Sequence, residues 1–117
     1  MRTLKDIAEE LNLSVLSAEH SLEREVTGGY ASDLLSCAMA KAQDGNVWVT
    51  LQSHPNVVAV AALLGLAGVI IGEGRTPEAA TVAKADSEGV PLLVAPWTTF
   101  TIVARLAALG VTGLDQD

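Results

Sequence analysis

Polar residues that could bind a ligand are concentrated where predicted strands end and helices begin. They come from three short segments, residues 28–33, 52–56 and 72–76, which offer hydroxyl, amide and imidazole groups beside backbone N–H donors. In an open α/β sheet, ligands bind beyond the carboxyl ends of the strands and against helix N-termini. The candidate ligand-binding residues are Thr27, Gly28, Gly29, Ser32, Asp33, Gln52, Ser53, His54 and Asn56. This set favours a small polar or anionic molecule.

The same residues also have structural explanations. Ser32 and Asn56 could cap the helices that follow them, and His54 could be an ordinary turn residue. The paired glycines at 28 and 29 would let either a ligand or another backbone approach closely. Residues 72–74 lack the remaining glycine and the spacing of a dinucleotide-binding loop, so a turn is the simpler interpretation.

No motif of an enzyme reaction is found in the sequence. GxxxxGK[ST], GxSxG and HExxH are all missing. His54 is the best-placed acid–base residue, but no carboxylate or nucleophile is predicted to lie beside it. Cys37, the single cysteine, falls within a predicted helix, which favours a small core residue over a reactive thiol. We therefore expect no catalytic residue, no metal site and no cofactor.

The composition favours one acidic, well-packed domain over residues 1–117, with hydrophobic residues at 50% and a formal net charge of −7. Excess acid repels phosphate groups, so neither nucleic acid nor a membrane is an expected partner. A charged N-terminus without an apolar signal core, and the lone cysteine, predict a cytoplasmic protein. The surplus of apolar residues predicts a homodimer.

The elements that must position the candidate residues alternate between strands and helices. Residues 45–74 form the central unit, with a buried strand at 46–52, a helix at 57–66 and a second strand at 69–71. Further strands are predicted at 13–16, 26–30 and 91–95. Further helices are predicted at 3–11 and at 98–109. Two more helices are expected to start at Ser32 or Asp33, and at Thr76-Pro77-Glu78, the latter running to residue 88. The alternation indicates an α/β fold, and residues 111–117 are predicted to be a frayed or partly ordered tail.

Two stretches resemble the DRTGG domain family. They are EVTGGYASDLLS at residues 25–36 and VTLQSHPNVVAVA at residues 49–61, and the resemblance extends from about residue 4 to residue 109. The pentad that names the family is partial here: Arg24 is kept, two residues intervene, and Thr27-Gly28-Gly29 completes it.

The resemblance implies a bacterial three-layer α/β/α sandwich with a mainly parallel sheet of about five short strands. Stand-alone members are encoded beside iron-iron hydrogenase genes, and related domains occur in HPr kinase/phosphorylase and some phosphotransacetylases, where they are non-catalytic. The implied function is that of a regulatory domain sensing a small anionic ligand, either a nucleotide or a phosphorylated metabolite. The alternative is an interaction module that assembles a hydrogenase-type redox enzyme complex.

Overall fold

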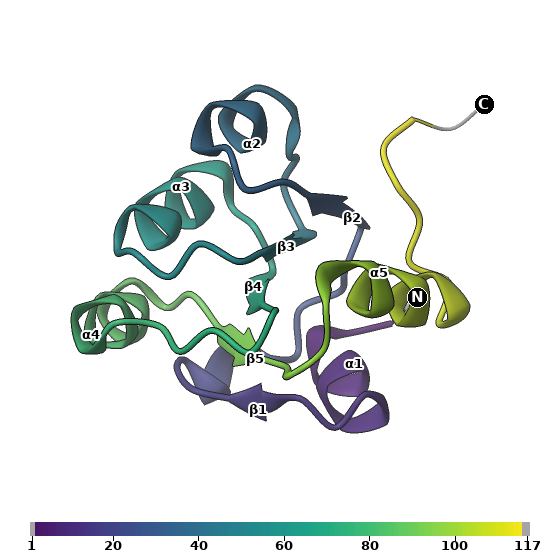
Figure 1. The fold of residues 1–117 in the computed structure, drawn as a ribbon, viewed down its shortest axis with the longest axis horizontal. Helices are drawn as coiled ribbons and strands as arrows, with labels where there is room; N and C mark the ends of the chain where they lie inside the picture. The colour runs from purple at the N-terminus through teal and green to yellow at the C-terminus, as the bar shows by residue number, and fades with distance from the viewer. Residues whose placement is uncertain (1, 116–117) are drawn as a thin grey trace.

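A five-stranded sheet lies between two layers of helices in the computed structural model, which describes residues 2–115 (Figure 1). The strand order is β1-β5-β4-β3-β2, parallel except that β1 runs antiparallel to β5. In chain order the elements are α1 (Leu4–Glu10), β1 (Ser14–Val15), a short 3-10 helix (Glu19–Ser21), β2 (Gly28–Ala31), α2 (Leu35–Lys41), β3 (Asn46–Thr50), α3 (Asn56–Leu64), β4 (Gly68–Ile71), α4 (Ala79–Glu88), β5 (Leu92–Val94) and α5 (Thr99–Ala108). The predicted three-layer α/β fold is confirmed.

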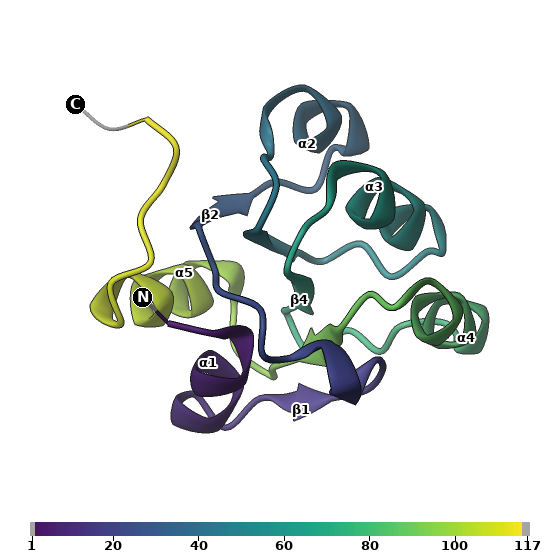
Figure 2. The same cartoon turned by 180° about the vertical axis from the view of Figure 1, so that it is seen from behind.

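The two faces of the sheet are covered unequally. Helices α2, α3 and α4 pack on one face, whereas α1 and α5 pack on the other (Figures 1 and 2). Every residue of β3 and β4 is buried, as expected for central parallel strands with helices on both sides. Two separate hydrophobic cores result, and Trp48, fully buried on the three-helix side, is the largest side chain in either.

Several predicted helix ends are confirmed by local geometry. Thr3 and Asp6 form a reciprocal capping box at the start of α1, with hydrogen bonds of 3.1 and 3.0 Å. Gly65 ends α3 in the left-handed conformation that favours glycine, with φ of 69°.

Two predicted helix starts are wrong. Helix α2 begins at Leu35 without a side-chain cap, because the Asp33 carboxylate bonds to β3 instead. Helix α4 begins at Ala79, three residues after the predicted Thr76 cap. There the chain stays extended through Glu78, whose backbone N–H donates to the Ser53 carbonyl at 3.3 Å.

Of the two alternatives for the C-terminal tail, its first residues are ordered. Val111 packs against the core on the two-helix side, and the Thr112 carbonyl accepts a 2.8 Å hydrogen bond from the Gly29 backbone N–H. The segment thereby covers part of the free edge of β2, where backbone donors would otherwise face water. Residues 116 and 117 of the predicted tail lie outside the described residues.

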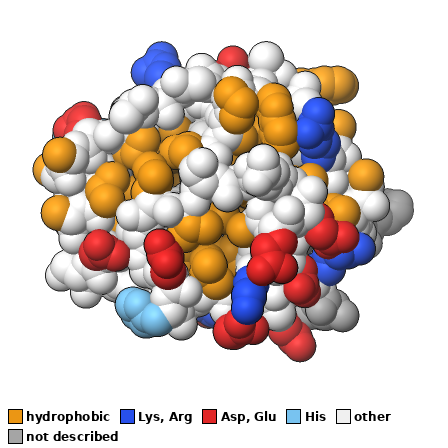
Figure 3. Space-filling model, turned by 90° about the horizontal axis from the view of Figure 1, so that it is seen from below, with side chains coloured by type: hydrophobic (Ala, Val, Ile, Leu, Met, Phe, Trp, Pro, Cys, Tyr) orange, Lys and Arg blue, Asp and Glu red, His pale blue; other side chains and the backbone are white. Residues whose placement is uncertain are grey.

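Hydrophobic side chains also reach the surface in patches, as the view from below shows (Figure 3). The most exposed large ones in the described part of the chain are Leu34, Leu63 and Phe100, at 64%, 71% and 84%. Within residues 2–115 no helix is long and apolar enough to cross a membrane.

Candidate functional site

The predicted site residues divide between the two ends of the parallel strands. We call the side where β2 and β3 begin the amino edge, and the side where they end the carboxyl edge. Strands β2 and β3 are parallel, with Gly28 opposite Asn46 and Ala31 opposite Val49. Their carboxyl ends therefore bring Ser32 and Asp33 beside residues 51–53. Thr27 and Gly28 instead lie at the amino edge, and Gly29 follows inside β2, so the expectation that this segment follows a strand is wrong. The strand predicted at 26–30 already contained Gly28 and Gly29, and β2 ends at Ala31, so that only Ser32 and Asp33 of this segment follow it.

At the amino edge, Thr27 holds the turn that leads into β3. Its hydroxyl donates to the Asp44 carbonyl at 2.8 Å and accepts from the Asn46 amide at 3.1 Å, while its backbone N–H donates to the Gly45 carbonyl. Arg24 adds an exposed ion pair with the Asp44 carboxylate at 2.9 Å. These polar groups are thus occupied by the protein's own turn.

The close approach expected at the paired glycines is made by the C-terminal segment of the chain itself. A Cβ atom on Gly28 would lie 3.1 Å from the Thr112 carbonyl oxygen, and one on Gly29 would lie 3.2 Å from Cγ1 of Val111. Both distances are tighter than ordinary van der Waals contact. The sequence left open whether a ligand or another part of the backbone approaches these glycines, and in the structure residues 111 and 112 of the chain do so.

At the carboxyl edge, Asp33 organises the ends of β2 and β3. Its carboxylate accepts hydrogen bonds from the Thr50 hydroxyl at 3.0 Å and the Leu51 backbone N–H at 2.8 Å. The Gln52 side chain donates to the Asp33 carbonyl at 2.8 Å. The buried Trp48 indole donates to the Ser32 carbonyl at 2.9 Å. This network fixes where Ser32 and Gln52 reach the surface.

At the start of α3 the N-cap residue is Pro55, and the side chain that accepts a backbone hydrogen bond is that of His54, so Asn56 is not the cap that the sequence offered as an alternative. Nδ1 of His54 accepts from the Asn56 backbone N–H at 3.1 Å, and Asn56 is the first helical residue. The next two backbone N–H groups donate to the His54 and Pro55 carbonyls. Both the His54 and Asn56 side chains are exposed at this edge.

Glu73, within the third predicted segment, has a role at the carboxyl edge that the sequence did not reveal. Its carboxylate accepts a 2.6 Å hydrogen bond from the Thr99 backbone N–H, and its own N–H donates to the Trp97 carbonyl. The turn at 72–74 thus supplies an acidic cap to α5. No local signal predicts this, because the partners lie 26 positions apart.

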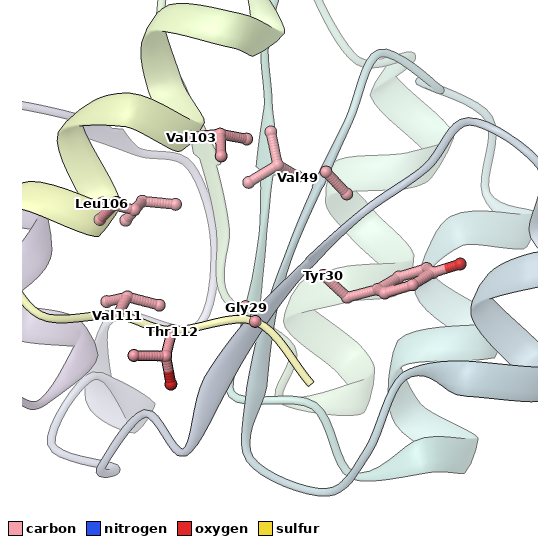
Figure 4. A pocket seen from close by; sticks show the side chains of 10 residues that line it. Gly29, Tyr30, Val49, Val103, Leu106, Val111 and Thr112 are labelled. Carbon is pink, nitrogen blue, oxygen red and sulfur yellow. The ribbon is translucent and has the colours of Figure 1, made fainter. Parts of the chain in front are cut away.

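A small apolar pocket opens beside α5 on the two-helix face of the sheet. It has a volume of about 150 Å³ and is lined by residues 29–31 of β2, by Val49, by α5 and by residues 111–113. Figure 4 shows Val49, Val103, Leu106 and Val111 around it, while the Tyr30 side chain points away across the strand. The sequence did not predict this pocket, because its wall is assembled from four separate segments.

The described residues contain no group of histidine, cysteine and acidic side chains that could hold a metal ion. Cys37 is half-buried on α2, so the expected core position is met only in part. The features available for binding thus include the polar side chains at the carboxyl edge and the apolar pocket. A second pocket, of about 470 Å³, lies at the amino edge and is lined by Arg2, Thr27, Gly28 and residues 109–112.

Comparison with known proteins gives a fold relationship. No protein-family model matches the chain, and no curated protein does. Among solved structures, the chain is similar to the CBS and DRTGG domains of the regulatory region of Clostridium perfringens pyrophosphatase, a structure complexed with its activator, diadenosine tetraphosphate. The TM-score is 0.73 and the identity 16%, over 94% of this chain and 47% of that one. This chain thus spans about half the length of that relative, and the expected DRTGG-like fold is confirmed.

Proposed function

We propose that this chain is a non-catalytic regulatory domain that binds a small anionic ligand, either a nucleotide or a phosphorylated metabolite. The observation that carries the proposal is the fold similarity, over 94% of the chain, to a regulatory region complexed with a nucleotide activator. A regulatory role requires only that binding at one surface changes the behaviour of an attached or associated protein.

The ligand surface that we propose is the carboxyl edge of β2 and β3. Ser32, Gln52, Ser53, His54 and Asn56 reach the surface there beside the start of α3. The partial positive charge at a helix N-terminus favours an anion, and the exposed imidazole and amides supply hydrogen bonds.

Two groups of predicted contact residues serve this surface indirectly or not at all. The Asp33 carboxylate would repel an anion, but its bonds to Thr50 and Leu51 hold the two strand ends in place. Thr27, Gly28 and Gly29 lie on the opposite edge and form no part of the proposed surface.

A thermal-shift screen against nucleotides and sugar phosphates tests the proposal. A compound at 100 times its dissociation constant adds about 2.7 kcal/mol of apparent stability, which the screen detects. Calorimetry with the strongest hit should then show at least tenfold weaker binding for His54→Ala and for Asn56→Ala. His20→Ala is the matched control, since His20 is equally exposed but lies in the 3-10 helix after β1. Unchanged affinity in both site variants would contradict the proposed surface.

The alternative function is an interaction module of a hydrogenase-type redox enzyme complex. The observation that favours it is the exposure of Leu34 and Leu63, large apolar side chains that solvent does not favour. This alternative predicts no hit in the ligand screen. It also predicts that a purified hydrogenase subunit binds the chain in calorimetry, and that Leu34→Asp or Leu63→Asp weakens that binding.

A further inference from the structure

The sheet is left partly uncovered where β2 passes α5. Three helices cover one face, but only α1 and α5 cover the other (Figures 1 and 2). The C-terminal segment at 111–113 fills only part of the open place, and the apolar pocket of Figure 4 remains between it, β2 and α5. Beside the pocket, Phe100 on α5 is 84% exposed, the most exposed large hydrophobic residue described.

We propose that a second copy of this chain docks against α5, so that Phe100 of each copy enters the apolar pocket of the other. The pocket volume is about 150 Å³. A cavity of roughly that size, lined by aliphatic side chains, holds a benzene molecule in another protein. The Phe100 side chain is a benzene ring on one methylene group, so its size and polarity match the pocket.

The positions along α5 make this contact reciprocal. Phe100, Val103 and Ala107 share one side of the helix, because a spacing of three and seven residues returns to nearly the same face. Val103 and Ala107 line the pocket. When two α5 helices pack antiparallel about a two-fold axis near Val103 and Ala104, Phe100 of one copy lies opposite Ala107 of the other. Both pockets are then filled by the same operation, as an isologous interface requires.

The charge distribution selects this face for self-association. Two copies of a chain with a formal net charge of −7 repel each other wherever acidic residues meet. All fourteen acidic residues lie outside residues 89–114, the segment that contains α5, and the one basic residue within it is Arg105. The Arg105 guanidinium stacks 3.8 Å from the centre of the Trp97 ring of its own chain. Helix α5 itself therefore presents no acidic side chain to a second copy, and the Glu73 carboxylate beside its first residue is occupied by the Thr99 backbone N–H.

The size of the face sets the expected strength. Helix α5 has ten residues and is about 15 Å long, which is short for a stable interface that buries ~800 Å² on each partner. We therefore expect a reversible dimer with a dissociation constant in the micromolar range. This association is independent of the proposed anionic ligand, since the carboxyl-edge residues take no part in it.

Sedimentation equilibrium of the full chain tests the proposal. The wild-type protein should pass from its monomer mass of 12.1 kDa towards twice that value as its concentration rises. Phe100→Asp should raise the dimer dissociation constant at least tenfold. The control variant Leu63→Asp, at an exposed hydrophobic residue of another helix, should leave the dimer dissociation constant within a factor of two of the wild-type value. A wild-type monomer at about 1 mM, or equal loss of the dimer in both variants, would overturn the proposal.

Cysteine cross-linking tests the position of the two-fold axis and keeps Phe100 in place. In a Cys37→Ser background, Ala104→Cys, at an exposed position of α5 beside the proposed axis, should form a covalent dimer on mild oxidation with diamide. Leu63→Cys, at an exposed position of α3, should cross-link at least tenfold more slowly. Equal rates for the two variants would overturn the proposed arrangement.

Discussion

Replacing Gly45 by alanine tests whether Thr27 is a structural residue. Gly45 sits in the turn before β3 with φ of +82°, a conformation that side chains rarely adopt. An added Cβ would lie 2.7 Å from Cγ2 and 2.8 Å from the hydroxyl oxygen of Thr27. The Thr27 side chain cannot easily yield, because its hydroxyl bonds to the Asp44 carbonyl and the Asn46 amide.

The size of the effect has two separable parts. Holding alanine in the left-handed region costs ~1–2 kcal/mol. Crowding a well-packed neighbour costs a further ~1–3 kcal/mol. Gly74→Ala isolates the first part, since Gly74 has φ of +70° and nothing within 4 Å of an added Cβ. We therefore expect Gly45→Ala to lower the free energy of unfolding by ~2–5 kcal/mol, and Gly74→Ala by ~1–2 kcal/mol.

Urea unfolding followed by circular dichroism measures both variants, with equal slopes confirming that the unfolded states are comparable. Thr27→Ala should also cost less stability in the Gly45→Ala background than in the wild type, because removing the hydroxyl and methyl relieves the clash. Equal losses for Gly45→Ala and Gly74→Ala would refute the reasoning. A Thr27→Ala variant that keeps full stability but loses ligand affinity would return Thr27 to the ligand site.

The remaining predictions concern α3, α1 and β2. His54→Ala should lower the free energy of unfolding by ~0.5–2 kcal/mol by removing the cap of α3, whereas Asn56→Ala should change it by less than ~0.5 kcal/mol; equal losses in urea would contradict this assignment. The pKa of the Asp6 carboxyl is lowered, chiefly by the hydrogen bond from the Thr3 backbone N–H. The stabilisation that the ionised Asp6 carboxylate provides is therefore present above the ordinary pKa of aspartate and is lost as the pH falls through the lowered value. Asp6→Asn should accordingly make the melting temperature fall less steeply at acid pH, and an unchanged fall would count against this role of Asp6. Gly29→Val should destabilise by ~1–3 kcal/mol and speed hydrogen exchange of the residue 29 amide, and normal protection would show that the C-terminal segment is not held there.

The central part of the fold could be predicted from the sequence because its signals are local. Val47, Val49 and their neighbours form an uninterrupted apolar run that suits a strand covered on both faces, and β3 is indeed buried throughout. The helices predicted at 57–66 and up to 88 end close to those positions, at Gly65 and Gly89, both with positive φ. In these stretches the local preference and the tertiary environment favour the same structure.

The site could be predicted less well, because its partners are distant in the sequence. Asp33 has the side chain and the sequence position of a helix cap, but its carboxylate accepts a hydrogen bond from the Thr50 hydroxyl, 17 residues away. Asn56 is likewise displaced by the imidazole of His54 two residues earlier. A sequence shows which side chains can accept a hydrogen bond, but the packing decides which donor comes within reach.

The separation of the two sheet edges also explains what a partial DRTGG-like pentad can report. In this chain Arg24 faces the Asp44 carboxylate, Thr27 ties down the turn before β3, and Gly28 and Gly29 admit the C-terminal segment. Each of these tasks belongs to the entrance of β2 and is needed to build the sheet. In this chain the pentad residues thus serve the fold. At the opposite edge Asp33 and His54 also make structural hydrogen bonds, so a ligand contact there has to be separated from a structural role by measuring affinity and stability together.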